Sequence, residues 1–191
     1  MGWDSLADQI APADYVHGVG ALALAFNKLE FELYGLLGCF LPEEAVPSVY
    51  YALHNAGRVD HITRMANRTL SEAECSAVEY GLKCFNLCAE NRNLLVHAMP
   101  DTQTRDAVCF VKAVPGKPGD LAEYYIPLAA IREAVTATVT TDSYLGALVL
   151  EIMFHDEEGA GPLPERPPQP RKLSLYRHVE DLTGEEPPPQ S

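Results

Sequence analysis

The sequence has no apolar run long enough to cross a membrane. Its best candidate, LGALVLEIMF at 145–154, is much shorter than the roughly 20 residues that a spanning helix needs and contains Glu151. The N-terminus lacks the basic and apolar stretches of a secretory signal, and Leu6 stands where the myristoylation pattern requires serine or threonine. We therefore expect a cytoplasmic protein with no membrane partner.

The number and spacing of the cysteines fit neither a disulfide framework nor a zinc site. The five cysteines are an odd number scattered along the chain. Cys84 and Cys88 lie one helical turn apart, but zinc needs four ligands and no CxxC or HxxxH partner is near. His54 and His61 share a predicted helix face, again without a carboxylate on that face. We expect buried free thiols, and neither a metal nor another cofactor.

Positive charge is also scarce. The chain has 14 lysines and arginines against 27 acidic residues, which gives a net charge of -13. Because phosphate contacts supply most non-specific affinity for nucleic acids, this balance excludes broad electrostatic capture, and any RNA contact needs a local patch. Aromatic residues that could stack on bases are limited to Tyr50, Tyr51 and Phe85, which fit a core equally well.

What the sequence has is strong helical periodicity. Nearly half of its 191 residues are hydrophobic, enough for one domain with a good core. Apolar residues spaced by three and four predict a helix at 15–40, and Pro47 suits the first turn of a second helix that ends near 69. Ser71 followed by Glu74 predicts a capping box that begins a third helix, which runs to about 98.

After Pro100 the hydrophobic period changes from 3.6 to 2. AVCFVKAV and AEYYIPL read as two strands joined by the turn PGKPGD, which predicts a β-hairpin at about 107–126. A fourth helix should follow at 128–154, with a kink or break in its middle, TATVTTDSY, which is rich in poor helix formers. The sequence thus predicts a mainly α fold, an up-and-down four-helix bundle with a β-hairpin inserted before the last helix.

Composition divides the chain into three parts. We expect an N-terminal arm at 1–12, the helical domain at 13–155 and a Pro-rich acidic tail at 156–191, which holds eight acids against four bases. GAGPLPERPPQP cannot form a helix or a central strand, so we expect an extended, exposed spacer there. Its PERPPQP part also fits a groove that reads polyproline, and LSLYRHVEDL at 173–182 can form a short docked segment.

The end of the third predicted helix, ENRNLLVHAMP at 90–100, carries the candidate site. Arg92 interrupts an apolar line on this helix, and its permanent charge needs an acceptor partner. Glu30, which flanks the apolar stripe of the first helix, is the candidate partner. Glu90, Asn93 and His97 share the neighbouring face, which an ordinary solvated helix side would also explain.

Helix geometry limits how this site can work. Five positions separate Arg92 from His97, which places them about 140° apart around the helix axis, whereas Asn93 and His97 point the same way. Arg92 and His97 therefore cannot both point straight at one target. The reach of the arginine side chain, unwinding of the helix before Pro100, or a second copy of the helix in a two-fold dimer would close this gap.

The second predicted helix carries a band of basic residues at spacings of three and four. Its members are Arg58, His61, Arg64 and Arg68. One interpretation is a contact with RNA or phosphate. The other is a solvated helix face with Asp60 nearby.

Arg92, Asn93 and His97, at the end of the third helix of a short helical bundle, resemble the R-x(4-6)-H motif of the HEPN superfamily, in which a polar residue often follows the arginine. FNKLEFELYGLL, which carries Glu30, resembles the family's apolar first helix with its core-facing acid. The resemblance covers residues 13–100, and 128–154 as the fourth helix. The hairpin and the tail lie outside it.

The resemblance implies a metal-independent endoribonuclease that acts as a homodimer, in a toxin or defence setting and with a possible antitoxin or regulatory partner. His97 would be the general base or acid, because histidine titrates near neutral pH. Arg92 would neutralise phosphorane charge, Asn93 would orient His97 or bind phosphate, and Glu30 would fix Arg92. Because many members of this superfamily are not nucleases, the alternative is a non-catalytic dimer that binds a nucleotide or a protein.

Overall fold

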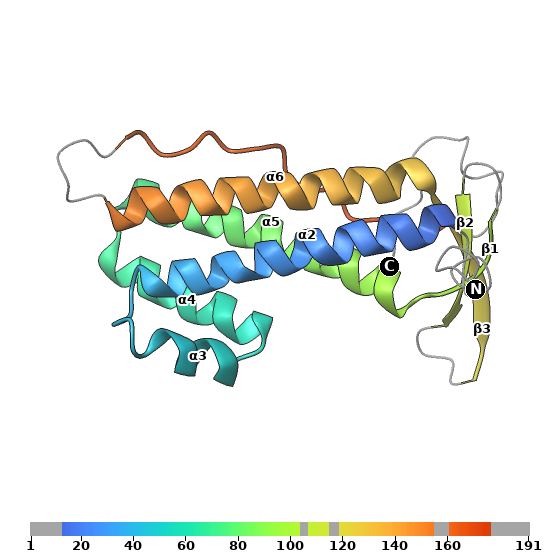
Figure 1. Ribbon diagram of the computed structural model, residues 1–191, viewed down its shortest axis with the longest axis horizontal. Helices are drawn as coiled ribbons and strands as arrows, with labels where there is room; N and C mark the ends of the chain where they lie inside the picture. The colour runs from blue at the N-terminus through green and yellow to red at the C-terminus, as the bar shows by residue number, and fades with distance from the viewer. Residues whose placement is uncertain (1–12, 104–106, 115–118, 155–160, 177–191) are drawn as a thin grey trace, which may run out of the picture. The chain divides into compact units, whose positions relative to one another are not determined.

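The computed structural model describes residues 13–103, 107–114, 119–154 and 161–176 (Figure 1). These residues form five helices and three strands, so the fold is mainly α as predicted. In chain order the elements are α2 (Ala13–Gly38), α3 (Val46–Ala52), α4 (Asn55–Thr69), α5 (Glu72–His97), β1 (Met99–Gln103), β2 (Ala107–Ala113), β3 (Leu121–Pro127) and α6 (Leu128–Met153). The expected N-terminal arm at 1–12 and the end of the tail at 177–191 lie outside the described residues.

The chain divides into two compact units, which are described separately. The sheet unit comprises residues 13–23, 90–135 and 171–176 as far as they are described. The helical unit comprises residues 24–89 and 136–170, with the same restriction. Helices α2, α5 and α6 contribute residues to both units, so the units share elements although each has its own core.

The core of the helical unit follows from the apolar spacing of its helices. Side chains from α2 to α6 form one buried cluster, and Phe26 of α2 lies 5.5 Å from Phe85 of α5 between ring centroids. Burial of each such side chain contributes about 1.5–3 kcal/mol. Besides Phe85, the members with no exposed surface are Leu29, Leu33, Leu36, Leu37, Ile62, Val78, Leu145 and Leu148. None of the described helices has the length and apolar character that crossing a membrane requires.

The sheet unit contains an antiparallel sheet of strand order β1-β2-β3. The predicted hairpin is present as β2 and β3, paired from Ala107 with Pro127 to Ala113 with Leu121. The third strand, β1, was not predicted, and it pairs Met99 with Val111 of β2. Pro100 is compatible with β1 because this is an edge strand, where a missing N–H is tolerated.

The core of the sheet unit joins the sheet to the helix segments beside it. The rings of Tyr15 and Phe110 meet edge to face at 5.2 Å, and the Tyr15 hydroxyl donates a hydrogen bond to the backbone carbonyl of Leu95. Ile126 of β3 and Ile131 of α6 are buried in the same cluster. Burial and this tyrosine hydrogen bond therefore fix the end of α5, which carries the candidate site.

The single helix predicted from Pro47 to Thr69 was wrong, because α3 ends at Ala52 and α4 begins at Asn55. The backbone is extended at both Leu53 and His54. Arg58 stabilises the break, since its Nε donates to the carbonyl of Tyr50 at 2.9 Å and its Nη1 donates to Oδ1 of Asn55 at 2.7 Å. Arg58 of α4 thus satisfies the carbonyl of Tyr50, which lies near the end of α3.

The break predicted in the last helix is absent, because α6 is continuous from Leu128 to Met153. Hydroxyl groups in the threonine-rich middle bond to backbone carbonyls one turn earlier, as Thr140 does to Thr136 at 2.9 Å and Thr141 to Ala137 at 2.8 Å. Because these hydroxyl groups find their hydrogen-bond partners within the helix, they do not disrupt the backbone hydrogen bonds of α6.

The predicted capping box at the start of α5 is confirmed. The backbone N–H and hydroxyl of Ser71 donate to Oε2 of Glu74 at 2.9 and 2.5 Å, and the Glu74 N–H approaches the Ser71 hydroxyl at 3.4 Å. The five cysteines are free thiols. Those at 84, 88 and 109 are buried, and those at 39 and 75 are half-buried.

The described part of the tail is extended as predicted, and eight of its sixteen residues are exposed, but other residues pack against the two units. In the helical unit the Tyr80 hydroxyl donates to the carbonyl of Pro167, Leu163 packs on the core, and Pro170 is buried. In the sheet unit Leu173 is buried in the core cluster. The tail is therefore part of both units, which the composition of a Pro-rich spacer did not indicate.

Candidate functional site

The end of α5 places two of the predicted site residues at one pocket of the sheet unit. The cavity has a volume of about 490 Å³, and Asn93 and His97 line it together with Glu90, as their spacings of three and four predict. Its other lining residues are Asn91, Leu94, Lys112, Lys172, Leu173 and Leu175. The predicted polar face of α5 thus opens on a cavity, and both Asn93 and His97 are exposed.

Arg92 lies beside this pocket but is not among the described residues that line it. Its side chain is half-buried, and its Nη1 donates to Oδ1 of Asn93 at 3.0 Å. This placement agrees with the angle of about 140° expected between Arg92 and His97 around the helix. The structure therefore brings Asn93 and His97 together and connects Arg92 to them through Asn93.

Two lysines complete the pocket, and sequence reasoning missed both. Lys112 comes from β2, and Lys172 comes from the tail, where its Nζ lies 2.9 Å from Oε2 of Glu90. Both Lys172 and Glu90 are more than half exposed, so the ion pair contributes little stability. The ion pair instead positions Lys172, because Glu90 holds the ammonium group of this lysine at the edge of the pocket that His97 lines. No local sequence pattern connects these elements.

Asn91 was also missed, although the sequence contains a signal for it. It continues the buried line of α5 through Cys84, Cys88 and Leu95, and it is only 2 % exposed. A buried amide needs hydrogen-bond partners. Here the partners are backbone groups of the tail, the carbonyl of Arg171 and the N–H of Leu173, each at 2.8 Å.

Glu30, predicted to support Arg92, makes its ion pair with Arg58. Oε1 of Glu30 lies 2.9 Å from Nη1 of Arg58, and the guanidinium also lies 3.8 Å from the ring centroid of Tyr50. The side chain of Arg58 is 11 % exposed, so these contacts account for its charge without a phosphate ligand. The Glu30–Arg92 contact stays a prediction, because these residues belong to different units.

The rest of the predicted basic band lies on α4. Arg64 is exposed and pairs with Asp60 one turn earlier, with Nη2 2.6 Å from Oδ2. Arg68 is exposed in the last turn of α4, and His61 is half-buried. An exposed ion pair of this kind is typical of a solvated helix face, the alternative that the sequence left open. A phosphate contact at Arg64 or Arg68 stays a prediction.

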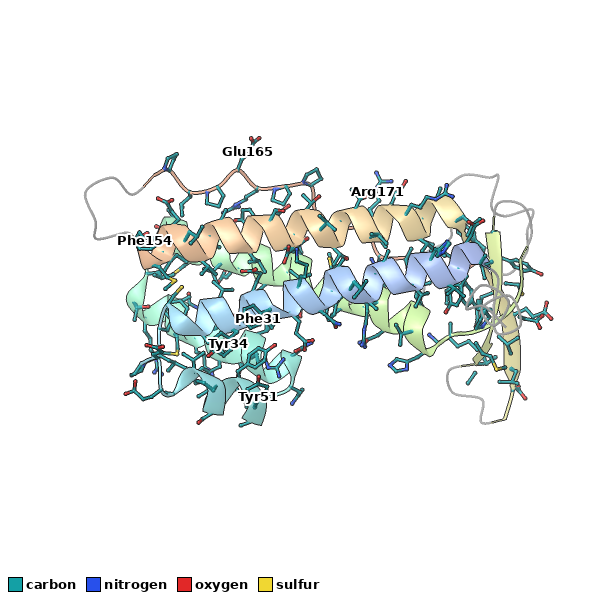
Figure 2. The ribbon with its side chains drawn as sticks, in the orientation of Figure 1. Phe31, Tyr34, Tyr51, Phe154, Glu165 and Arg171 are labelled. Carbon is teal, nitrogen blue, oxygen red and sulfur yellow. The ribbon has the colours of Figure 1, made fainter. Side chains whose placement is uncertain are left out.

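Aromatic rings gather on the helical unit near α3 (Figure 2). Phe31 and Tyr34 of α2 stack with centroids 5.3 Å apart, and Tyr51 meets Tyr50 edge to face at 5.3 Å. Phe31 and Tyr51 are largely exposed, whereas Phe85 is fully buried in the core. Of the three aromatic residues considered as a platform for bases, only Tyr50 and Tyr51 are therefore at the surface.

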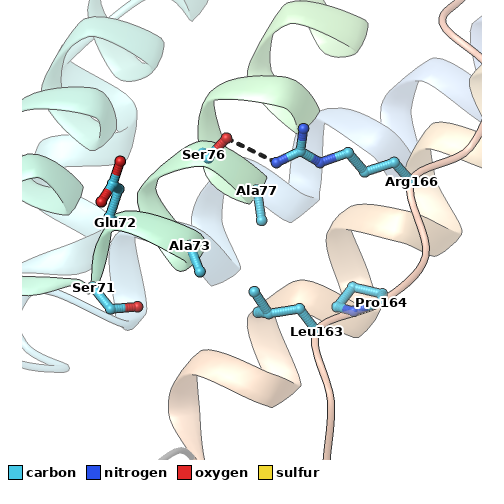
Figure 3. A pocket seen from close by; sticks show the side chains of 8 residues that line it. All are labelled: Ser71, Glu72, Ala73, Ser76, Ala77, Leu163, Pro164 and Arg166. Carbon is cyan, nitrogen blue, oxygen red and sulfur yellow. Dashed lines mark hydrogen bonds between the residues drawn. The ribbon is translucent and has the colours of Figure 1, made fainter.

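A second pocket, of about 630 Å³, lies in the helical unit between the start of α5 and the tail (Figure 3). Arg166 of the tail donates to the Ser76 hydroxyl at 2.8 Å, and its guanidinium lies 5.3 Å from the ring centroid of Tyr80. The other lining residues are Ser71, Glu72, Ala73, Ala77, Leu163 and Pro164. The described residues that line this pocket include no histidine. The contacts of Arg166 at the pocket hold the tail against α5.

Two half-buried acidic side chains of the helical unit, Glu32 and Asp142, repel each other. Burial, together with the negative charge of Asp142, raises the pKa of Glu32, while Lys28 acts in the opposite direction. Among the described residues, no group of three or more histidine, cysteine, aspartate and glutamate side chains is arranged to hold a metal ion. Repulsion between Glu32 and Asp142 therefore lowers the stability of the folded protein when both side chains are charged.

Comparisons of the chain with protein-family models, with curated proteins and with solved structures found no match.

Proposed function

We propose that the protein is a metal-independent endoribonuclease of HEPN type, and that the pocket lined by Asn93 and His97 holds the scissile phosphate of RNA. The observation that carries the proposal is the composition of this pocket. It places a histidine, an asparagine and the lysines Lys112 and Lys172 around one cavity in a protein that is otherwise strongly acidic. Glu90 also lines the cavity and pairs with Lys172, so the two lysines and this glutamate give the lining a net charge of +1 in a protein of net charge -13. Contact with RNA requires such a local excess of positive charge.

The proposed chemistry is an attack of the ribose 2'-oxygen on the adjacent phosphorus. The bond from phosphorus to the 5'-oxygen breaks, which leaves a 2',3'-cyclic phosphate and a free 5'-hydroxyl. His97 takes the proton of the 2'-hydroxyl or gives a proton to the leaving 5'-oxygen. Lys112 and Lys172 attract the phosphate, and Asn93 donates to it through its amide N–H groups, because its oxygen already accepts from Arg92.

The proposal includes a homodimer. Arg92 does not line the pocket of its own chain among the described residues, yet phosphorane charge is best neutralised by a guanidinium. The Arg92 of a second copy supplies that group, and two copies related by a two-fold axis form one cleft with two histidines. In this proposal α2, α4, α5 and α6 are the four helices of a HEPN-type bundle, which their shared core in the helical unit supports.

RNA cleavage by purified protein tests this function. A mixed RNA pool at neutral pH in EDTA should be cut by the parent and by His17→Ala, whose histidine is exposed on α2 away from the pocket. His97→Ala should lose at least about 100-fold in rate, the usual contribution of a general acid or base. Intact RNA with the parent protein, or equal cleavage by His97→Ala, would overturn the proposal.

The alternative is a non-catalytic dimer that binds a nucleotide or a protein. It predicts no cleavage by any variant, and an effect of His97→Ala on binding only if the dimer interface moves. Light scattering on the parent and on Arg92→Ala determines the oligomeric state. A toxin or defence role, with an antitoxin or regulatory partner, extends the nuclease proposal and depends on it.

A further inference from the structure

The tail segment 171–176 is held in the sheet unit mainly through its backbone. The buried amide of Asn91 donates from Nδ2 to the carbonyl of Arg171 and accepts at Oδ1 from the N–H of Leu173, both at 2.8 Å. These two backbone groups exist in any extended peptide, so the contact does not depend on the identity of the side chains. A buried asparagine that uses both ends of its amide on one peptide is a docking device.

The sheet contributes a second backbone contact. Tyr176 and Tyr125 exchange two hydrogen bonds, with the Tyr125 N–H donating at 2.8 Å and the Tyr176 N–H donating at 3.1 Å. Tyr125 belongs to β3, which is an outer strand of the three-stranded sheet. An extended peptide that pairs with the free edge of a sheet is a common mode of peptide recognition.

Between these two contacts the side chains alternate as in a strand. Leu173 is 7 % exposed and enters the core cluster of the sheet unit, which also contains Leu95 and Ile126. Lys172, one residue earlier, extends to Glu90. Backbone contacts at both ends, an apolar socket and an adjacent acid therefore select an extended peptide in which a basic residue precedes a leucine.

We propose that Glu90, Asn91, the Leu173 socket and the outer edge of β3 form a docking groove for an extended peptide of a partner protein, and that the chain's own tail is the resident ligand of this groove. The partner segment carries the same pattern as the tail, a basic residue followed by leucine in an extended backbone. It binds by taking the place of residues 171–176. Docking in the groove does not require the proposed RNA cleavage, although both use Lys172, because none of the groove's contacts involves Arg92, Asn93 or His97.

Exchange of the tail for a partner segment has a consequence for the neighbouring pocket. Lys172, Leu173 and Leu175 line the cavity together with His97, so a peptide that displaces them replaces part of its wall. Binding of a partner in the groove would then replace the side chains of these three residues with those of the partner. Peptide binding in the groove and ligand binding in the pocket therefore affect each other through these three residues, whatever ligand the pocket takes.

The test uses the full-length chain and a fluorescein-labelled peptide with the sequence of residues 161–176. The parent protein should bind the peptide weakly, because the covalently attached tail competes at high effective concentration. Leu173→Asp, which removes the tail from its socket, should bind at least about 10-fold more tightly by fluorescence anisotropy. A peptide that carries the same Leu173→Asp change should not bind.

Two controls locate the binding to the groove. In the Leu173→Asp chain, adding Asn91→Ala should weaken peptide binding at least 10-fold, whereas Asn86→Ala, which changes an exposed asparagine of the same helix, should not alter it. Tyr176→Pro is a second release variant, since it removes the N–H donated to Tyr125 and leaves the socket unchanged. Circular dichroism confirms that each variant is folded.

Hydrogen exchange of the backbone amides at 172–176 reports whether the tail has been released. Faster exchange in Leu173→Asp or Tyr176→Pro, together with tighter peptide binding, is the expected result. The proposal is overturned if neither variant releases the tail, or if a chain with a released tail binds the peptide no better than the parent. Equal binding by the Asn91→Ala and Asn86→Ala chains would also overturn it.

Discussion

Glu30 and Arg58 form an ion pair that joins α2 to α4, with 2.9 Å between Oε1 and Nη1. The same guanidinium reaches the Tyr50 carbonyl and Asn55, so one side chain connects α2 to both sides of the break between α3 and α4. The side chain of Arg58 is 11 % exposed and that of Glu30 is 30 % exposed. This partial burial means that loss of one partner leaves a poorly solvated charge.

Arg58→Ala should therefore lower the free energy of unfolding by about 2 kcal/mol, from the lost hydrogen bonds and the unpaired Glu30. Arg64→Ala is the matched control, because Arg64 pairs with Asp60 on the same helix while both side chains are more than 60 % exposed. It should change stability by no more than about 0.5 kcal/mol. Urea unfolding measures both values, and equal losses in the two variants would contradict the structural role of Arg58.

The contacts of Arg58 also show where sequence reasoning was sufficient and where it was not. The spacing of apolar residues predicted α2, α5 and α6, because buried stripes are a property of each helix alone. The pairing of Glu30 depends on which basic residue is nearest in space. Two arginines, Arg58 and Arg92, were available, and no local pattern distinguishes them.

The same limit applies to the sheet and to the candidate site. Residues 99–103, MPDTQ, do not alternate between apolar and polar, so β1 forms only because β2 offers an edge to pair with. Asn93 and His97 share one helix face and were predicted together. Lys112 and Lys172 were missed because they reach the pocket from β2 and from the tail. The docked segment at 173–182 was predicted, and its described part, 173–176, is docked on the sheet unit. The contacts that hold it were missed, because Asn91 binds backbone groups that composition does not reveal.

Glu32 should make stability depend on pH. Its pKa is raised in the folded protein by burial and by Asp142. A carboxyl group whose folded pKa exceeds its unfolded pKa stabilises the fold fully below the unfolded pKa, and this contribution is lost as pH rises through the folded pKa. Glu32→Gln should consequently be more stable than the parent at pH 8, and the difference should shrink as pH falls toward 4.

Thermal unfolding of the two proteins from pH 4 to pH 8 measures this difference. Glu133→Gln, which changes an exposed glutamate of α6, serves as the control for loss of one negative charge in an acidic protein. If both variants gain the same stability at pH 8, the effect arises from net charge rather than from the half-buried Glu32 and its repulsion by Asp142.

Cys39 should react slowly with alkylating reagents. Burial raises the pKa of its thiol to about 11, against the ordinary value near 8.5, and only the thiolate is nucleophilic. At pH 8 the thiolate fraction falls by roughly 100-fold or more relative to a free cysteine. Iodoacetamide labelling followed by peptide mass spectrometry should show this protection in the native protein and its loss in guanidinium chloride. Rapid native labelling of Cys39 would contradict the burial of its sulfur.

Two glycines in helices should respond to the same substitution in opposite directions. A Cβ added at Gly81 of α5 would collide with Cδ2 of Leu145 and lie 3.2 Å from Cε1 of Tyr144, both on α6. A Cβ at Gly20 of α2 would meet no atom within 4 Å. Leu145 is fully buried, so it cannot move away without disturbing the core of the helical unit.

Gly81→Ala should therefore destabilise the protein by about 1–3 kcal/mol, the usual cost of overpacking, less what alanine gains in helix propensity. Gly20→Ala should stabilise it by about 0.5–1 kcal/mol, because only the propensity gain remains. Urea unfolding of the two single variants measures both signs in one protein. A stabilising Gly81→Ala would mean that α5 and α6 do not approach as closely at this position, and the packing of the helical unit would have to be revised.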